Sequence, residues 1–199
     1  MSKIIGILAL QGDFAAHSVM LKHLNVEPRL IKLPQQLASL DGLIIPGGES
    51  TTISKQITSN QAWLTAFADI HKKRLPIFST CAGLILISKQ IRPNQFSLGW
   101  LDIIVQRNGY GRQINSHFSK AAFTVHGREK IIEIPLIRAP KIISIGAEVI
   151  PLVQEQQQIY LVEQQHLLAA TFHPELTKQT DIHSYFLEKV DKYKFTRDD

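Results

Sequence analysis

The chain has a single cysteine, Cys81, and its neighbours in the sequence favour a nucleophilic role. The stretch "PIFSTCAGLIL", residues 76–86, reads as a buried strand, a sharp turn and the start of a helix. At a helix N-terminus, free N–H groups and the helix dipole favour the thiolate form of cysteine. Ser79 and Gly83 are small enough for the strained turn of a nucleophile elbow. This stretch alone leaves open that Cys81 is a small buried hydrophobic residue.

A second stretch, "FHPEL", supplies an imidazole and a carboxylate. Pro174 disfavours the helical conformation for His173, so we expect an extended segment in which His173 and Glu175 point to the same side. A cysteine nucleophile needs an imidazole base and a group that orients it. None of the seven other histidines has an acid two residues later across a proline. His173 is therefore the candidate base and Glu175 the candidate orienting acid; the alternative is a surface turn.

The third stretch, "PGGESTT", is a glycine-containing loop before an expected helix. Backbone N–H groups around Gly47 and Gly48 can approach a ligand or an oxyanion closely. The loop is not a phosphate-binding Walker loop, because it lacks Gly-Lys-Ser/Thr and because Glu49 would repel phosphate. The alternative is a plain turn in which Ser50 and Thr51 cap the helix.

The front half of the chain alternates strand and helix, which predicts a parallel α/β sheet covered by helices on both faces. Expected strands lie at residues 3–10, 27–33, 41–48 and 75–80. Expected helices lie at residues 14–24, from 51 onward, and at 61–72. Ligands of such sheets bind outside the carboxyl ends of the strands. The three stretches above all fall at such ends, so we expect them to form one site.

The back half contains short strand-like runs separated by glycine, proline or polar turns. These runs predict antiparallel pairing or an excursion beside the main sheet; they lie at residues 121–127, 134–140, 141–153, 157–164 and 166–175. The last run is expected to end at His173-Pro174-Glu175. A helix is expected from Asp181 to Lys194. The chain has neither an internal repeat nor a linker, so residues 1–199 are predicted to form a single domain.

Composition limits the class of protein. The 22 Lys+Arg and 17 Asp+Glu residues are scattered, and the one tight cluster, residues 72–74, falls at an expected helix end, so no nucleic-acid-binding stripe is predicted. One cysteine cannot form an internal disulfide, which favours a reducing compartment. The longest uncharged stretch, Leu75–Ser88, is too short to span a bilayer, and the N-terminus lacks a signal-peptide cleavage pattern. A cytoplasmic protein without membrane contact is expected.

Six motifs occur in an order that resembles one family. The motifs are "LALQGD", "PGGESTT", "TCAGLILI", "QRNGYGRQ", "IRAP" and "FHPELT". They resemble the class I (triad) glutamine amidotransferases and, among these, the glutaminase subunits of pyridoxal 5′-phosphate synthases. Two positions depart from the usual pattern: Ser79 replaces a glycine, and Gly109 replaces a small side chain. The resemblance covers essentially the whole chain and implies a flavodoxin-like three-layer α/β/α sandwich with a mostly parallel sheet.

The resemblance also implies an activity, namely hydrolysis of L-glutamine to L-glutamate and ammonia. Cys81 looks like the nucleophile, with His173 and Glu175 completing the triad and no metal or cofactor required. The oxyanion would be held by backbone N–H groups near Gly48 and Ala82. The positions that match the family's glutamine-binding residues are Gly47, Gly48, Glu49, Ser50, Arg107, Ile137 and Arg138.

The implied partner is the synthase subunit, a (β/α)8 barrel that would accept the ammonia in a hetero-oligomer. Three alternatives remain at this stage. The chain could be a glutaminase for another acceptor, such as imidazole glycerol phosphate synthase. It could be a catalytically inactive relative that acts as a binding module. It could also be a cysteine hydrolase of esters or lactones, although that alternative gives no reason for "HPE" or for the arginine-containing motifs.

Overall fold

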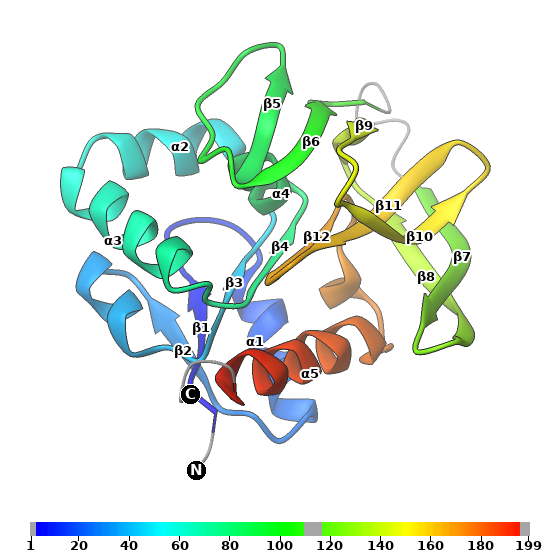
Figure 1. The fold of residues 1–199 in the computed structure, drawn as a ribbon, viewed down its shortest axis with the longest axis horizontal. Coiled ribbons are helices and arrows are strands. Elements are labelled where there is room, and N and C mark those ends of the chain that lie inside the picture. The colour runs from blue at the N-terminus through cyan, green and yellow to red at the C-terminus, as the bar shows by residue number, and fades with distance from the viewer. Residues whose placement is uncertain (1–2, 110–116, 196–199) are drawn as a thin grey trace.

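The computed structural model describes residues 3–109 and 117–195, and its centre is a nine-stranded sheet (Figure 1). One part of this sheet is parallel and has the strand order β2-β1-β3-β4-β12, which is the order of flavodoxin-like folds. The parallel strands are β1 (Ile5–Leu8), β2 (Pro28–Ile31), β3 (Gly42–Ile45), β4 (Ile77–Thr80) and β12 (Leu167–Ala170).

The strand after β12 in the sheet begins an antiparallel part, as expected for the back half of the chain. Its strands, in sheet order, are β11 (Gln158–Gln164), β10 (Ile150–Glu155), β7 (His117–Val125) and β8 (Arg128–Leu136). A second sheet of three strands contains β5 (Ser88–Arg92), β6 (Leu101–Gln106) and β9 (Lys141–Ile145).

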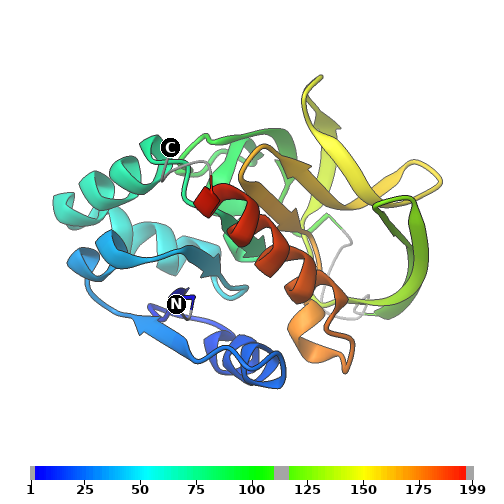
Figure 2. The same cartoon turned by 60° about the horizontal axis from the view of Figure 1, so that its bottom comes forward.

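Helices cover both faces of the parallel strands, which confirms the three-layer sandwich (Figure 1). One face carries α2 (Ser50–Thr58), α3 (Gln61–Lys72) and α4 (Ala82–Ile87). The other carries α1 (Phe14–His23) and α5 (Asp181–Phe195). In Figure 2, α5 crosses in front and the antiparallel strands lie to its right, away from α2 and α3. Within residues 3–109 and 117–195, no helix is long and apolar enough to cross a membrane.

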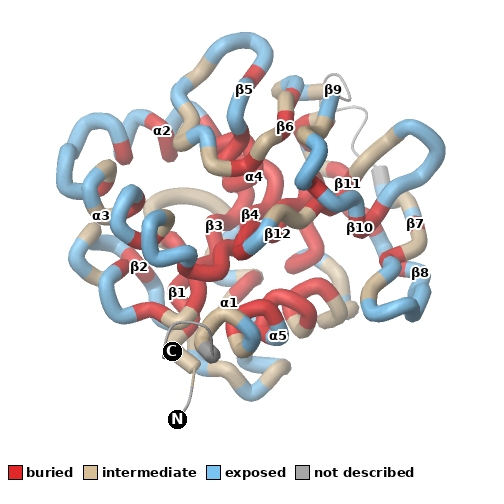
Figure 3. The backbone as a smooth tube through the Cα atoms, in the orientation of Figure 1, coloured by how far each residue is buried: buried red, intermediate tan, exposed pale blue. Residues whose placement is uncertain are grey.

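Alternating strand side chains divide the core into two clusters. Leu43 packs in the cluster under α2, α3 and α4, whereas its neighbour Ile44 packs in the cluster under α1 and α5. Ile77 and Phe78 divide in the same way. Successive strand residues point to opposite faces, so a strand between two helix layers must be apolar throughout. Figure 3 accordingly shows the central strands and α4 as buried.

Several expected boundaries were wrong. Strand β12 ends at Ala170, three residues before His173, and residues Pro174–Leu176 form a short 3-10 helix, η3. The run at 134–140 is strand only as far as Leu136, because Arg138 has a φ of 49°, which a strand does not allow. The run at 141–153 divides into β9 and β10, which belong to different sheets.

Strands β5 and β6 and the short 3-10 helix η1 (Pro34–Ser39) were not predicted. The apolar run of α4 passes directly into β5 without a glycine or proline to mark the change. Ser88 makes the change by taking a φ of −64° and a ψ of 150°. Its buried hydroxyl donates a 2.6 Å hydrogen bond to the carbonyl of Leu84, in the last turn of α4.

Candidate active site

The three predicted stretches meet at one edge of the sheet. Gly47 follows β3, Cys81 follows β4 and His173 follows β12, and these strands are immediate neighbours in the order β3-β4-β12. Because the strands are parallel, their carboxyl ends lie together. The cleft that they form has a volume of about 300 Å³ and is lined by Gln11, Asp13, Gly48, Glu49, Ser50, Cys81, Ala82, Ile85, Arg107, Asn108, Ile137, Arg138 and His173.

Cys81 occupies the turn between β4 and α4 in a strained conformation. Its φ is 46° and its ψ is −101°, values that cost a non-glycine residue about 1–3 kcal/mol. The turn is held by a 2.9 Å hydrogen bond from the N–H of Cys81 to the carbonyl of Ala170, at the end of β12. The Cys81 residue is only 6% exposed, and it lines the cleft.

The small residues on either side of Cys81 are each explained by a different contact. A β-carbon on Gly83 would collide with the carbonyl oxygen of Ile45, so α4 can lie this close to β3 only with glycine there. Ser79 is fully buried on β4, and its hydroxyl lies 3.5 Å from the carbonyl oxygen of Leu168 on the neighbouring strand. Ser79, which replaces the glycine usual in the family, therefore fits between the two strands.

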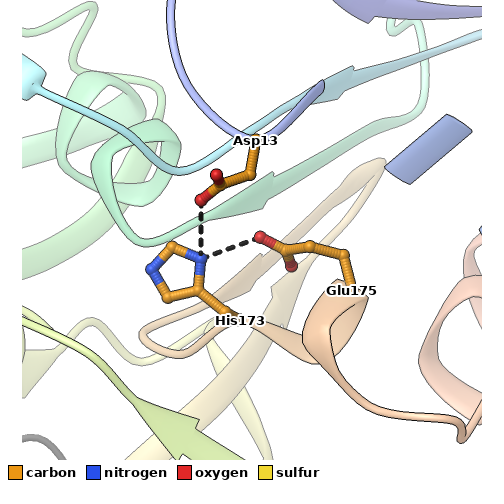
Figure 4. A group of neighbouring side chains, drawn as sticks. All are labelled: Asp13, His173 and Glu175. Carbon is orange, nitrogen blue, oxygen red and sulfur yellow. Dashed lines mark hydrogen bonds and ion pairs between the residues drawn. The ribbon is translucent and has the colours of Figure 1, made fainter. Parts of the chain in front are cut away.

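His173 is held by two carboxylates at the same ring nitrogen (Figure 4). Its Nδ1 lies 2.8 Å from Oε1 of Glu175 and 3.5 Å from Oδ2 of Asp13. Burial acts to lower the pKa of His173, but interactions with Cys81 and Glu175 outweigh it and raise the pKa to about 11. The imidazole therefore keeps a proton readily when it lies between a thiolate and a carboxylate.

Glu175 reaches His173 by a different route from the one expected. His173 has a ψ of 77°, and Glu175 lies in the η3 turn rather than in an extended segment. The two side chains lie on the same side, as expected, but a turn rather than an extended segment brings them together. The Glu175 side chain has no exposed surface, and desolvation raises its pKa, while the hydrogen bond and charge of His173 act to lower it.

The Gly47-Gly48 loop is packed tightly against its surroundings. The N–H of Gly47 donates to Oγ1 of Thr80 at 2.9 Å, and its carbonyl accepts from the N–H of Asp13 at 3.1 Å. Gly48 has a φ of 156°, and a β-carbon there would collide with the side chain of Gln11. The segment after β1 thus forms one wall of the loop.

Glu49, rather than Ser50 or Thr51, caps helix α2. Its carboxylate accepts hydrogen bonds from both the N–H and the hydroxyl of Thr51, at 3.3 and 2.9 Å. These bonds lower the pKa of Glu49, and the positive charges of Arg107 and Arg138 lower it further. The Glu49 carboxylate therefore shares the cleft with two guanidinium groups.

The far wall of the cleft comes from the back half of the chain. Arg107 and Asn108 follow β6, while Ile137 and Arg138 follow β8. Of the motif "QRNGYGRQ", residues 110–113 lie outside the described part of the chain. Gly109 is explained by crowding, because a β-carbon there would overlap the side chain of Lys141.

All eleven predicted site residues lie at this cleft or directly behind it. Gly47 and Glu175 do not line the cleft but support its wall, since both contact His173. The lining residues that were not predicted are Gln11, Asp13, Ile85 and Asn108. The strand-end rule applied to β1 would have found Gln11 and Asp13 in the motif "LALQGD".

Asp13, His173 and Glu175 are the described residues whose arrangement could hold a metal ion, because their ligand atoms lie within 4.8 Å of one another. An ion there would have to replace the proton that Nδ1 of His173 shares with Glu175. The same arrangement can orient an imidazole beside a thiol, so it can support nucleophilic attack on an acyl or amide carbon.

Comparisons with known proteins agree on one family. The model of the SNO glutamine amidotransferase family matches residues 7–192. The protein named pyridoxal 5′-phosphate synthase subunit PdxT from Thermosipho africanus is 43% identical over 94% of this chain and 99% of its own length. The protein of the same name from Pseudothermotoga lettingae is 45% identical over 92% of this chain and 94% of its own length.

Solved structures give the same result. A crystal structure described as a glutamine amidotransferase is 37% identical, has a TM-score of 0.87, and matches over 94% of this chain and 99% of its own. A chain in the structure of PurLQS from Thermotoga maritima has a TM-score of 0.64 over 98% of this chain and 99% of its own. Its sequence is only 14% identical, so it supports the fold alone.

Proposed function

The chain belongs to the SNO glutamine amidotransferase family, and on that basis we propose how its cleft hydrolyses glutamine. It is a glutaminase that converts L-glutamine to L-glutamate and ammonia, and the ammonia is used in pyridoxal 5′-phosphate (vitamin B6) biosynthesis. One observation carries the mechanism: Nδ1 of His173 is bound by the buried Glu175 carboxylate, while the imidazole also interacts with Cys81 in its strained turn.

Cys81 is the proposed nucleophile. Its thiolate attacks the side-chain carbonyl carbon of glutamine, and the new C–S bond gives a tetrahedral intermediate with a negatively charged oxygen. Backbone N–H groups of Gly48 and Ala82, both of which line the cleft, would stabilise this oxygen. The thiol proton is held by His173, and Glu175 keeps the ring in place.

Release of the products uses the same imidazole twice. His173 first gives its proton to the departing nitrogen, so that ammonia leaves and a thioester remains on Cys81. It then takes a proton from a water molecule that attacks the thioester, which yields glutamate and free Cys81. The reaction consumes one water and leaves no net change in the enzyme.

The charged wall of the cleft suits the free amino-acid end of the substrate. The Glu49 carboxylate matches the α-ammonium group, and the guanidinium groups of Arg107 and Arg138 match the α-carboxylate. The cleft size of about 300 Å³ is near the lower end of the range for small-molecule sites. We propose that Ser50 and Ile137 contact the side-chain methylene groups and the α-carbon of the same glutamine.

Ammonia released into water would be lost unless an acceptor lies nearby. The relatives are named as subunits of pyridoxal 5′-phosphate synthase, so the proposed partner is the synthase subunit, a (β/α)8 barrel. In this proposal the hetero-oligomer works in the cytoplasm and binds neither nucleic acid nor membrane.

The test combines the chain with a purified synthase subunit and supplies glutamine, a pentose phosphate and a triose phosphate. We expect glutamine-dependent formation of pyridoxal 5′-phosphate and release of glutamate. A glutamine-mimicking diazo-ketone should form one adduct by intact-mass analysis, and Cys81→Ala should form none. Glutamate release without pyridoxal 5′-phosphate formation would reject the acceptor, while an adduct on Cys81→Ala would reject the nucleophile.

A further inference from the structure

A buried histidine pair lies directly behind the catalytic cleft. His17, on α1, has no exposed surface and does not line the cleft. Its Nδ1 is 2.9 Å from Nε2 of His183, a buried residue on α5. Its Nε2 is 3.2 Å from Oγ1 of Thr80 and 3.4 Å from Oε2 of Glu175. Two helices on the same face of the sheet therefore join their imidazoles to the end of β4 and to the proposed triad acid.

The second oxygen of Glu175 needs a partner. Oε1 accepts from His173, while the other oxygen is directed away from that ring (Figure 4). Within residues 3–109 and 117–195, Oε2 is buried and has no hydrogen bond of good geometry. The nitrogen that faces Oε2 of Glu175 is Nε2 of His17. A buried carboxylate oxygen without a donor is costly, so the proton position on His17 decides whether this contact is attractive.

The surroundings select one tautomer for both imidazoles. If Nδ1 of His17 carried the proton and donated it to His183, a neutral His183 would have its own proton on Nδ1. That atom is buried and has no hydrogen-bond acceptor in the described part of the chain. An unpaired buried N–H is avoided in proteins. The opposite order, in which Nε2–H of His183 donates to Nδ1 of His17 and Nε2–H of His17 donates to Oγ1 of Thr80, leaves no imidazole N–H unpaired.

This order turns the Nε2–H of His17 toward Thr80 and Glu175. The proton is donated to Oγ1 of Thr80, and its positive edge faces Oε2 of Glu175. Oγ1 of Thr80 also accepts the N–H of Gly47. His17 is therefore connected to two parts of the site, the acid that orients His173 and the glycine loop beside the proposed oxyanion position.

We propose that His17 is a positioning residue for the glutaminase reaction, whose Nε2–H fixes Glu175 and Thr80 while His183 fixes its tautomer. This inference rests on the proposed roles of His173 and Glu175, and His17 itself touches no reacting atom. Burial and the nearby His183 and His173 hold the pKa of His17 well below its usual value, consistent with a neutral donor. The rings of His17 and Phe78 pack nearly perpendicular to each other, with their centroids 6.0 Å apart.

The first test measures the tautomers without any mutation. The full-length chain is labelled with 15N-histidine, and the ring nitrogen shifts are assigned by NMR at pH 7. His17 and His183 are both expected as neutral Nε2–H forms, with His17 unchanged down to about pH 5. A neutral Nδ1–H form of His17, or a charged His17 at pH 7, would overturn the proposal.

The second test uses two amides that place their NH2 groups differently. In His17→Gln the amide can reach the former Nε2 position, whereas in His17→Asn it reaches only the Nδ1 position. We expect kcat to fall on the order of 10- to 100-fold in His17→Asn, because Glu175 loses its fixed position. His17→Gln should recover most of this loss. The matched control is His23→Gln, an exposed position on the same helix.

Two further readouts separate positioning from a general packing defect. The KM for glutamine should change less than threefold in both variants, because His17 lies outside the cleft. Loss of the N–H raises the pKa of a carboxylate, so the acidic limb of kcat/KM should move to higher pH in His17→Asn and return in His17→Gln. Groups that face this network are Asp13, Thr80, His173, Glu175 and His183.

The outcomes distinguish this inference from the proposed function. Equal losses in His17→Gln and His17→Asn with an unmoved acidic limb would show that the imidazole only fills space, and the proposal would be rejected. Should either variant fail to fold, the tautomer measurement still decides. An inactive wild-type complex would instead reject the proposed function, and the tautomers of His17 and His183 would remain measurable.

Discussion

Gly47 lies so close to His173 that a β-carbon at residue 47 would overlap Cε1 of the imidazole and lie 3.2 Å from the β-carbon of Cys81. The absence of a side chain at Gly47 therefore leaves the space that the imidazole of the proposed base occupies. Its N–H and carbonyl are both occupied, by Thr80 and Asp13, so the loop cannot move aside without breaking these two hydrogen bonds.

Gly47→Ala is predicted to lower kcat by about 10²-fold, because the methyl group displaces His173 from Cys81 by a fraction of an ångström or more. Glutamine turnover in the complex measures the effect. Gly99→Ala is the comparison, since a β-carbon there meets nothing within 4 Å although its φ is 73°. That variant should lose about 1 kcal/mol of stability and keep its activity. Full activity in Gly47→Ala would contradict the crowding argument.

The two proposed partners of Cys81 are predicted to differ in importance. His173→Asn should remove nearly all glutaminase activity, because both thiolate formation and proton transfer depend on the ring, an effect of about 10²- to 10⁴-fold. Glu175→Gln should cost less, because it leaves the imidazole present but poorly oriented. Single-turnover rates of glutamate release compare them. Equal losses would mean that Glu175 has a second task, and unchanged rates in both variants would reject the triad.

The second glycine is predicted to control the oxyanion donor rather than the thiol. In Gly48→Val the β-carbon would collide with the backbone Cα of Gly12 as well as with the Gln11 side chain, so we expect the loop to rotate and its N–H to leave the cleft. Loss of one oxyanion donor costs roughly 10²- to 10³-fold in turnover. Alkylation of Cys81 by a small neutral reagent should be nearly unchanged and serves as the internal control. If Gly48→Val turned over glutamine normally, the donors would lie elsewhere.

The same loop predicts that the synthase subunit increases glutaminase activity. The Gly47-Gly48 peptide can adopt two orientations, only one of which aims its N–H at the oxyanion. A change between them breaks the hydrogen bond from the N–H of Asp13 to the Gly47 carbonyl. Glutamate release should therefore be much slower for the isolated chain than with a saturating synthase subunit. Equal rates would rule out control of the loop by the partner.

Stability is predicted to fall with acidification below about pH 6.5. Burial lowers the pKa of His17, and burial lowers that of His183 to about 3. Above pH 6.5 these rings are neutral in both the folded and the unfolded state. Below pH 6.5 they are protonated in the unfolded chain but stay neutral in the folded chain. Each proton contributes about 1.4 kcal/mol per pH unit. Urea unfolding at pH 7, 6 and 5 measures the slope.

Two groups of the candidate site also affect this slope. The raised pKa of Glu175 acts in the opposite sense, because the folded chain then gains a proton on acidification. His173, whose pKa is raised to about 11, is protonated in both states below pH 6.5 and loses its stabilising contribution only as the pH rises toward 11. We expect the free energy of unfolding to change with pH as if the unfolded state bound one to two more protons than the folded state. A flat profile from pH 7 to 5 would show that the buried histidine pair accepts protons in the folded state.

Patterns in the sequence were enough to predict the fold class and most of the candidate site. Apolar runs within residues 3–10, 41–48 and 75–80 predict strands buried on both faces, since strands buried on one face alternate. Gly83 and the turn at Cys81 follow from local geometry, because a strand-to-helix elbow allows only small neighbours. Parallel strands bring their carboxyl ends to one edge, so motifs 34 and 92 residues from Cys81 were predicted to meet there.

The side chains that support that edge from behind could not be predicted without the three-dimensional structure. His17 reads in the sequence as one residue of a weakly periodic helix, and its contact with Glu175 depends on how α1 rotates and packs against the sheet. The far wall depends on a second sheet whose strand β5 has no break from α4 in the sequence. Periodicity and turn chemistry act over a few residues, whereas contacts between distant elements depend on register and packing, which no local pattern encodes.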